Sequence, residues 1–439
     1  MFAYYLDLAL RSLKRNKLLT VLMVLAIAVG IGASMTTLTV MHILSGDPLP
    51  GKSAHIFYPQ VDASPQSFSH GKPLDMLDYR SAVDLWRAHR ADRQALVVDS
   101  QAKVSAPSVN HPPRMLTVLS TTSDFFPMFN VPFAYGSAWT PEDGKNRARV
   151  AVISSDLNDK LFGGKNSVGE TLRLKDSNVR IVGVLAHWRP HPVFYDVAGG
   201  GANLGSTGSA FSRPEDVMLP FQTGLAINAG NFQQETCWAV PKTPGHLENS
   251  PCLWIQMWVQ LDTPAKVAAY RQFLVNYAQQ QKALGQFSQT DTRMMNLMQW
   301  LGHNDLIPSN VRLQTWLAFA FLVICLFNTV GLLLAKFMRR AGEIGIRRAL
   351  GASRHAVFAQ CLTEAGLIGL IGGIGGWLLT LAGLWLVRRQ QPPYSDLVHM
   401  DVSMFVITFA LAIAVSLIAG ALPALRASRV APALQLKTL

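Results

Sequence analysis

Few residues in this chain of 439 have the types and spacing that chemistry requires. The first candidate site is a short glycine–lysine sequence. Gly163-Gly-Lys165 resembles part of a phosphate-binding loop, in which backbone N–H groups and a lysine hold phosphate oxygens. Lys165 is followed by Asn166, however, and no G-x-x-x-x-G-K-[ST] occurs in the sequence. The stretch Gly199–Gly208 lacks the lysine and the strand–loop–helix setting of such a cradle, so we interpret it as a flexible loop. We therefore expect no ATP hydrolysis by this sequence alone and no cofactor bound by it.

The four cysteines form two pairs of different character. Cys237 and Cys252 fall in a polar stretch, where an oxidising compartment would permit a disulfide that closes a short loop. Two unpaired thiols are the alternative at these positions. Cys325 and Cys361 lie in or beside apolar stretches, and we expect them to be packing residues.

Metal-binding patterns are also weak. No Cys-x-x-Cys or Cys/His spacing suggests a zinc site. His187 and His191 are close in sequence, but Pro190 breaks any helix that would bring them onto one face. We interpret them as surface histidines and predict no metal site.

Four apolar stretches dominate the elements that must position these residues. Each runs about 20 residues or more without a charge, long enough to cross a bilayer as a helix: Leu18–Met41, Leu313–Ala335, Ala365–Val387 and Val402–Leu422. Gly46–Asn310 is polar and cannot lie in lipid. We therefore predict an α-helical membrane protein with four transmembrane helices in a 1+3 topology and a large α+β extracytoplasmic domain inserted between helices 1 and 2. The expected segments are an amphipathic N-terminal segment 1–17, helix 18–43, outer domain 44–310 with two subdomains, helix 311–335, cytoplasmic loop 336–360, helix 361–388, outer loop 389–401, helix 402–424 and tail 425–439.

Charge predicts the orientation. Short segments rich in Lys and Arg stay in the cytoplasm, and such residues gather before the first span, between the second and third, and after the fourth. Both termini and loop 336–360 are therefore expected in the cytoplasm, with the large domain outside. These segments carry most of the chain's formal charge of +12. The basic excess is thus a topology signal, and we expect no nucleic-acid partner.

The segment before the first span and several stretches of the outer domain have patterns that predict local structure. Apolar residues between Phe2 and Leu13 recur at helical spacing, which favours either an interfacial amphipathic helix or a longer first helix. Val150–Ile153 is predicted as a buried strand and Ser155–Phe162 as a helix capped by Ser154 or Ser155. Further predictions are a hairpin of strands Glu170–Leu174 and Val179–Leu185 around the turn Lys175–Asn178, and helices within Pro73–Arg90 and Thr263–Leu284, which together indicate an α+β sandwich.

Small residues in the spans predict close helix packing. Spacings of four occur at Ala26, Gly30 and Ser34 in the first span, and at Gly369, Gly372, Gly373 and Gly376 in the third. In lipid, small residues let helix backbones approach closely, so these helices expect helical partners. The spans carry no Asp, Glu, Lys or Arg in their interiors, which argues against an ion-coupled carrier or a channel.

The loop after the second span is the most suggestive cytoplasmic feature. Glu343–Leu350 can form a short helix with Ile346, Ala349 and Leu350 on one face and Gly351 as its stop. Such a helix could dock in a groove of a partner. A solvated basic loop is the alternative.

Several sequence segments resemble those of MacB/FtsX-type permeases of ABC transporters. Arg339–Ser353 is similar to the family's R-x-x-E-I-G-[IV]-R-x-A-[LM]-G-A signature, and Pro423–Pro432 to its P-A-x-x-A-[AS]-x-x-x-P ending. Phe125–Pro132, Val150–Ser154 and the short Leu161-Phe-Gly, Val168-Gly and Val182-Gly-Val sequences resemble its periplasmic core domain. The matches occur in the family's order and cover both ends and much of the centre.

The resemblance implies a permease without its own ATPase, in the bacterial inner membrane. Its partners would be two copies of a cytosolic ABC ATPase that bind ATP and magnesium, and a second permease protomer, identical or paralogous. ATP-driven closing and opening of the permease dimer would be passed along the helices to the outer domain. This process is called mechanotransmission. The coupling segment would be Glu343, Ile344, Gly345, Ile346, Arg347, Arg348, Ala349, Leu350, Gly351 and Ala352. Glu343 with Arg347 or Arg348 would make polar contacts with the ATPase, and Ile344, Ile346 and Leu350 would fill its groove.

The sequence departs from the family in two respects. In the exporter of the family the ATPase is fused before the permease, whereas only Met1–Lys17 precedes the first span here, so we expect a separately encoded ATPase. The stretch Trp188–Trp254 has no counterpart in the family that we can place. We expect specificity for a substrate or adaptor to lie there. Export of a peptide, drug or other periplasmic substrate is the favoured function, with a periplasmic adaptor and an outer-membrane channel as further partners. Lipoprotein release and non-transporting regulation of a periplasmic enzyme are the alternatives.

Overall fold

The computed structural model describes residues 2–15, 17–69, 73–107, 112–197, 209–243, 245–304, 309–390, 397 and 402–428. The chain divides into two compact units. Met1–Ser45 with Ile307–Leu439 forms one, which we call the helical unit, and Gly46–Leu306 forms the other, the sheet unit. The predicted loop Gly199–Gly208 and most of the tail from 429 lie outside the described residues.

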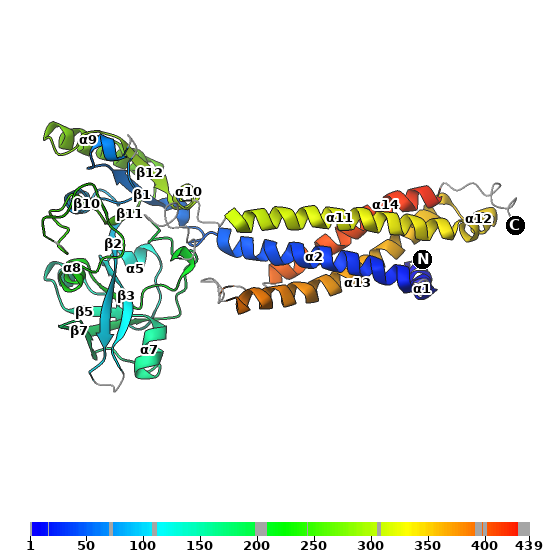
Figure 1. Ribbon diagram of the computed structural model, residues 1–439, viewed down its shortest axis with the longest axis horizontal. Coiled ribbons are helices and arrows are strands. Elements are labelled where there is room, and N and C mark those ends of the chain that lie inside the picture. Colours follow the sequence, from blue (N-terminus) through cyan, green and yellow to red (C-terminus); the bar gives the residue numbers. More distant parts are fainter. Residues whose placement is uncertain are drawn as a thin grey trace. The chain divides into compact units, whose positions relative to one another are not determined.

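The helical unit is built from long apolar helices. Its helices are α1 (Phe2–Arg15), α2 (Lys17–Ser45), α11 (Ser309–Arg339), α12 (Ala341–Ala349), α13 (Arg354–Arg389) and α14 (Val402–Ser428). By length and composition, α2, α11, α13 and α14 can each cross a membrane. They contact one another as a bundle, in which α2 and α14 each touch both α11 and α13 (Figure 1). Each predicted span lies inside one of these helices, which extend further because charged and polar residues continue the helical turns.

A short helix, α1, lies ahead of the first span-length helix in the sequence. The amphipathic α1 precedes α2, and its residues contact α13. Leu13 is buried in the apolar core of the helical unit, and Ser12 is buried as well. Part of the surface of α1 therefore packs on protein. The choice between an interfacial amphipathic helix and a longer first helix stays a prediction, because Asn16, which joins α1 to α2, lies outside the described residues.

The sheet unit contains one large mixed sheet. Its strands are β1 (Ile56–Val61), β2 (Arg93–Ser105), β3 (Arg114–Thr121), β4 (Phe133–Gly136), β5 (Val150–Ile153), β6 (Thr171–Leu174), β7 (Ser177–Leu185), β8 (Val217–Pro220), β11 (Gln256–Gln260) and β12 (Thr292–Asn296). The order is β12-β1-β11-β2-β3-β8-β5-β7-β4, and β6 pairs with both β2 and β7. Only the β3–β8 and β5–β7 pairs are parallel among the described strands. A small ladder of β9 (Thr236–Cys237) and β10 (Cys252–Leu253) stands apart.

Short helices cover the sheet, and two apolar cores lie against it. The helices are α3 (Gln66–Ser69), α4 (Tyr79–Arg87), α5 (Phe125–Met128), α6 (Pro141–Lys145), α7 (Ser155–Phe162), α8 (Phe221–Asn228), α9 (Pro264–Ala283) and α10 (Leu297–His303), with 3-10 turns η1 (Ser53–His55) and η2 (Ser209–Phe211). One core joins α4 and α9 to β1, β2 and β11, and the other joins α7 to β5, β6, β7 and β8. The unit thus consists of helices packed in layers on a mixed, mostly antiparallel sheet.

Most local predictions in the sheet unit agree with the structure. β5 and α7 have the predicted bounds, the Ser154 hydroxyl caps α7, and Gly163 ends it with a left-handed φ of 63°. The predicted hairpin forms, but Leu174 pairs with Ser177, so its turn is only two residues long. Helix α9 lies within the predicted range Thr263–Leu284, and the Thr263 hydroxyl caps it.

The predicted helix within Pro73–Arg90 begins later than its composition suggested. Leu77 forms a β-bridge with Ile255, which keeps the chain extended there. The Asp78 side chain then accepts a hydrogen bond from the Ser81 N–H, and α4 starts at Tyr79. The pairing of Leu77 with Ile255 therefore prevents the helix from starting before Tyr79.

Candidate functional site

The short helix α12 follows directly after the long helix α11. Arg340 separates the two helices, and Gly351, with a left-handed φ of 98°, ends the segment. The Ser353 hydroxyl then caps α13 by accepting from the Ala356 N–H at 3.2 Å. The residues Glu343–Ala352 therefore occupy a helix and its stop between two span-length helices, as the sequence predicted for a short helix.

A buried ion pair lies beside this segment. Lys336 Nζ of α11 is 2.5 Å from Glu364 Oε1 of α13, and both side chains are almost fully buried. The Ser12 hydroxyl of α1 donates to Glu364 Oε1 at 2.5 Å. Arg340 completes the group, since its Nη1 donates to Ser12 Oγ at 2.7 Å and lies 3.3 Å from Glu364 Oε2. These contacts join α1, α11 and α13 at one point.

Glu343 connects α12 to the same group. Its carboxylate accepts two hydrogen bonds from Arg340, at 3.0 and 3.2 Å, and pairs with Arg347 at 3.2 Å and with Arg15 at 3.7 Å. The Arg340 hydrogen bonds hold the pKa of the Glu343 carboxyl below its usual value, and the Arg347 and Arg15 charges add to this effect. Contact of Glu343 with an ATPase stays a prediction, but the structure gives this carboxylate partners within its own chain.

The other basic residues of α12 also have partners inside the helical unit. Arg347 donates to Gln360 Oε1 of α13 at 3.1 Å. Arg348 donates to the Ser428 carbonyl of α14 at 3.3 Å. The basic side chains of α12 therefore connect it to α13 and to α14.

The apolar residues of α12 divide between two faces. Ile344 packs against the apolar core of the helical unit, and Gly345 is buried. Ile346 and Leu350 are 47% and 82% exposed, and Ala349 is exposed beside them. Ile346, Ala349 and Leu350 thus form an outward apolar surface, which we call the α12 face. Ile344, which the sequence placed in the same groove-filling role, points instead to the protein core.

The small residues of the spans lie at close helix contacts. A Cβ on Gly372 or Gly376 would approach Ile27 or Ile31 of α2 to within 2.8 and 2.9 Å. Gly369 and Gly373 lie instead against Ser416 and Ala412 of α14.

Small residues of α2 meet α11. Gly30 faces Cys325 and Leu322, and the Ser34 hydroxyl donates to the Ala318 carbonyl at 3.0 Å. Ala26 is half-buried. The sequence missed Gly32, whose added Cβ would approach Leu379 of α13 to 2.7 Å. These contacts are all within one chain, and packing between protomers stays a prediction.

The cysteines behave differently in the two units. Cys237 and Cys252 are joined as a disulfide, with an S–S distance of 1.98 Å, and they face one another across the β9–β10 ladder. Cys325 and Cys361 are free and buried in the helical unit. The structure therefore contains the loop-closing bridge rather than two free thiols.

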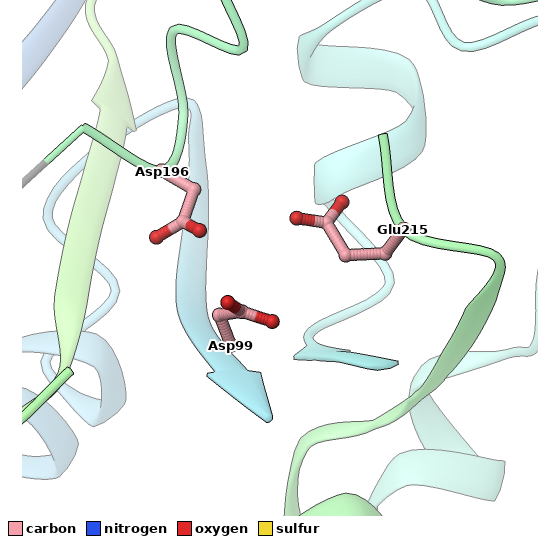
Figure 2. A group of neighbouring side chains, drawn as sticks. All are labelled: Asp99, Asp196 and Glu215. Atoms are coloured by element: carbon pink, nitrogen blue, oxygen red, sulfur yellow. The ribbon is translucent and has the colours of Figure 1, made fainter. Parts of the chain in front are cut away.

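A group of three carboxylates in the sheet unit escaped the sequence analysis. Asp99 of β2 lies close to Asp196 and Glu215, two residues of the stretch Trp188–Trp254 (Figure 2). One carboxylate oxygen from each lies within 4.8 Å of the others. An acidic residue inside the apolar strand Arg93–Ser105 was the one available signal, because the other two residues lie in irregular segments far along the chain. We call these three side chains the carboxyl cluster.

Amide and hydroxyl groups complete the carboxyl cluster. Gln256 and Gln234 donate to Asp196 Oδ1, the latter at 3.2 Å, and the Tyr195 hydroxyl donates to Glu215 Oε2 at 2.7 Å. Among the described residues no hydrogen bond reaches Asp99 Oδ1. Oxygen ligands in such a group suit a hard cation, and His187 and His191 are not among them.

Burial shifts the acidity of this cluster. Burial, followed by repulsion from Asp196 and Glu215, raises the pKa of Asp99 to about 9. Burial likewise raises the pKa of Glu215 to about 8 and that of Asp196 to about 6. Protons or a cation can offset the like charges, because ionised carboxylates so close together repel one another in a buried site.

Two family models match the sequence. Residues 20–277 match the MacB-like periplasmic core domain, and residues 316–432 match the FtsX-like permease C-terminal domain. The macrolide export ATP-binding/permease protein MacB of Wolinella succinogenes is 22% identical over 98% of this chain and 60% of its own length. The pyoverdine export ATP-binding/permease protein PvdT of Pseudomonas fluorescens is 26% identical over 71% of this chain and 41% of its own length. The chain thus spans about half the length of these relatives.

Solved structures with some likeness include the periplasmic region of MacB from Actinobacillus actinomycetemcomitans. It is 12% identical, with a TM-score of 0.37, and the match covers 60% of this chain and 97% of that one. The assignment therefore comes from the family models, of which the first alone covers more than half of the sequence. This chain belongs to the MacB/FtsX-type permease family of ABC transporters.

Proposed function

We propose that this chain is the permease subunit of an ABC transporter that works by mechanotransmission. A separate cytosolic ATPase, present in two copies that bind ATP and magnesium, docks on α12, and a second permease protomer completes the complex. The observation that carries the proposal is the α12 face, where Ile346 and Leu350 are exposed on a helix tied to its neighbours by charge. A partner's apolar groove would bury these side chains.

The route from α12 into the bundle runs through its ion pairs. A push on α12 reaches α1, α11 and α13 through Glu343, Arg340 and Glu364, because these groups are hydrogen-bonded in series. Bidentate Arg–carboxylate contacts fix geometry better than single contacts do. The glycine contacts of α13 with α2 and α14 extend this rigid connection along the bundle.

The membrane orientation belongs to the same proposal. Basic residues near α1, α12 and the end of α14 favour the cytoplasmic side of a bacterial inner membrane for both termini. The sheet unit is then periplasmic, inserted in a 1+3 arrangement between α2 and α11.

Export of a periplasmic small molecule is the transport function we favour. The relatives named for macrolide and pyoverdine export support it, since their matches cover 98% and 71% of this chain. Such export would involve a periplasmic adaptor and an outer-membrane channel. Lipoprotein release and regulation of a periplasmic enzyme remain the competing outcomes, which the identity of co-purifying proteins distinguishes.

Substitution on the α12 face tests the coupling. Leu350→Asp or Ile346→Asp is expected to reduce co-purification of an ATPase and stimulation of its activity at least about tenfold, since buried anchors dominate binding energy. Val240→Asp is the matched control, because Val240 is an equally apolar and 89% exposed residue of the sheet unit. Glu343→Lys is less informative, since it also breaks the internal ion pairs.

Full co-purification and stimulation after Leu350→Asp would contradict docking on the α12 face. Failure of any ATPase to co-purify with the unaltered chain in mild detergent would contradict the proposed subunit arrangement. Insertion into the membrane should be unchanged in all these variants, which separates a docking defect from a folding defect.

A further inference from the structure

A cavity of about 450 Å³ opens in the sheet unit, and none of the carboxyl cluster residues lines it. Helices α4, α6 and α8 contribute to it, together with residues that follow β3. Its volume falls in the range of pockets that bind small molecules, about 300–1,000 Å³. Nothing in the proposed coupling mechanism uses this cavity.

Aromatic side chains form the walls of the cavity, and their positions are fixed. They are Tyr79, Trp86, Trp139 and Phe221. The Tyr79 ring stacks on Trp254 at 6.3 Å, and its hydroxyl accepts a hydrogen bond from Gln222 at 3.1 Å. Trp139 packs edge-on against Phe126 at 4.9 Å. Such preformed apolar walls suit a flat or compact apolar body.

The rim of the cavity is basic. Arg87, His89, Lys145 and Arg147 line it, and no Asp or Glu is among the described lining residues. Lys145 pairs weakly with Glu142, at 3.5 Å in solvent. Arg87 and Arg147 form no ion pair with any other residue that the structure describes. The charge on the rim is therefore available to a ligand.

An unused hydrogen-bond donor lies in the same wall. Trp139 is only 3% exposed, and within the described residues its indole N–H has no hydrogen-bond partner. A buried donor without a partner is unfavourable, so such groups are usually satisfied by water or by a ligand. An oxygen atom of a bound molecule could satisfy it.

The backbone at the rim gives an independent observation. His89 and Arg147 have left-handed φ angles of 48° and 51°. Each is the residue after the C-cap of a helix, α4 for His89 and α6 for Arg147. Glycine is strongly preferred at this position, because it has no Cβ to strain the left-handed conformation. Basic side chains therefore occupy two rim positions where backbone stability favours glycine, a pattern typical of functional sites.

We propose that this cavity binds a small amphiphilic organic anion, with an aromatic or compact aliphatic body against the walls and its charge at the rim. Arg87 and Arg147 hold the anionic group, and Tyr79, Trp86 and Phe221 enclose the apolar body. This inference goes beyond the proposed transport function, because binding here requires no ATPase.

Photo-crosslinking of the full chain in mild detergent tests the proposal without the ATPase. The probe is 4-benzoylbenzoate, and 4-benzoylbenzamide is the matched neutral compound. We expect the anion to label peptides containing Tyr79–His89 and Trp139–Arg147, and the amide to label them about tenfold less, because a charge-assisted hydrogen bond is lost. Peptide mapping separates this labelling from non-specific labelling of the apolar helices.

Substitution by glycine separates ligand binding from folding. Arg147→Gly should raise the thermal unfolding midpoint, since it relieves the left-handed φ, and yet reduce labelling by the anion about tenfold. Lys175→Gly is the control, because Lys175 is also basic, has a φ of 49° and does not line the cavity. It should leave labelling unchanged, while loss of the hydrogen bond from Lys175 Nζ to the Ala229 carbonyl at 3.3 Å offsets the relief of the left-handed φ.

Three results would overturn the proposal. They are equal labelling by the anion and the amide, absence of label from both cavity peptides, and unchanged labelling after Arg147→Gly. None of them bears on ATPase docking, so the cavity and the transport mechanism can fail separately.

Discussion

In the helical unit Glu364 is buried beside Lys336 and Arg340, whereas in the sheet unit the buried Glu215 lies beside the half-buried Asp99 and Asp196. Both arrangements remove carboxyl groups from water, which is unfavourable for the ionised form. The first offsets this with opposite charges and the Ser12 hydroxyl. The second has no opposite charge within the cluster, so it depends on protonation or on a cation.

This difference in neighbouring charges determines what the stability of each group depends on. The Lys336–Glu364 group joins three helices by contacts whose strength depends on geometry, which suits the transmission of force. The carboxyl cluster joins β2 to the stretch Trp188–Trp254, and its strength depends on solution conditions because its pKa values are raised. Three predictions test this contrast.

The largest expected effect is at the buried pair. Glu364→Gln removes the counter-charge of Lys336, whose side chain is fully buried. Breaking a buried pair by removing one partner destabilises a protein by about 3–5 kcal/mol. We expect this loss in thermal or denaturant unfolding of the full chain in detergent.

The double variant Lys336→Met/Glu364→Leu is the control for this prediction. Replacing both charges by apolar residues of similar size removes the unpaired charge, so most of the lost stability should return. A Glu364→Gln variant as stable as the unaltered chain would show that water reaches Lys336, and the contrast with the carboxyl cluster would then disappear.

Neither group was predicted from the sequence, although much of the local structure was, and the reason is physical. The four spans, β5 and α7 depend on apolar runs and on neighbouring caps such as Ser154 and Gly163, which are close in the chain. Glu364 was visible only as a charge beside a span, because its partner Ser12 lies 352 residues away. The carboxyl cluster likewise requires the fold to bring Asp99 to Asp196 and Glu215, and no local spacing encodes that approach.

Helix α12 shows the same limit. A helix ending at Gly351 could be predicted from residues within one or two turns. The inward position of Ile344 and the internal partners of Glu343 could not, because α1 and α13 supply the packing surfaces. Likewise, the basic rim of the cavity combines the ends of two helices that are separate in sequence.

A smaller effect is expected at the carboxyl cluster, and it depends on pH. The folded-state pKa of Asp99 is raised from 3.8 to about 9, so the folded protein binds this proton more tightly than the unfolded chain does. Its contribution to stability is therefore full below about pH 4 and is lost as pH rises through about 9. Glu215 and Asp196 add losses that continue up to about pH 8 and pH 6.

Asp99→Asn should flatten this pH dependence, because the amide keeps the shape of the neutral acid and removes one charge. At pH 8 we expect the variant to be more stable than the unaltered chain by at least about 1 kcal/mol, since one pKa unit corresponds to about that free energy. Asp176→Asn is the control, because the Asp176 side chain lies in solvent at a hairpin turn. Unfolding midpoints measured from pH 5 to 9 that fall equally for all three proteins would refute the assignment.

The smallest effect is expected at Arg15, an exposed residue that pairs with Glu343 of the helical unit. Arg15 pairs with Glu343 at 3.7 Å, but its side chain is mostly exposed, and exposed pairs contribute only about 0–1 kcal/mol. Arg15→Ala should therefore lower the free energy of unfolding by no more than about 0.5 kcal/mol, similar to Arg11→Ala, which removes the exposed pair with Asp7. Added salt should abolish the small difference, because it screens exposed charges. A loss above about 1 kcal/mol that persists in high salt would mean that Arg15 belongs to the buried group with Glu364, and the network would then extend to the end of α1.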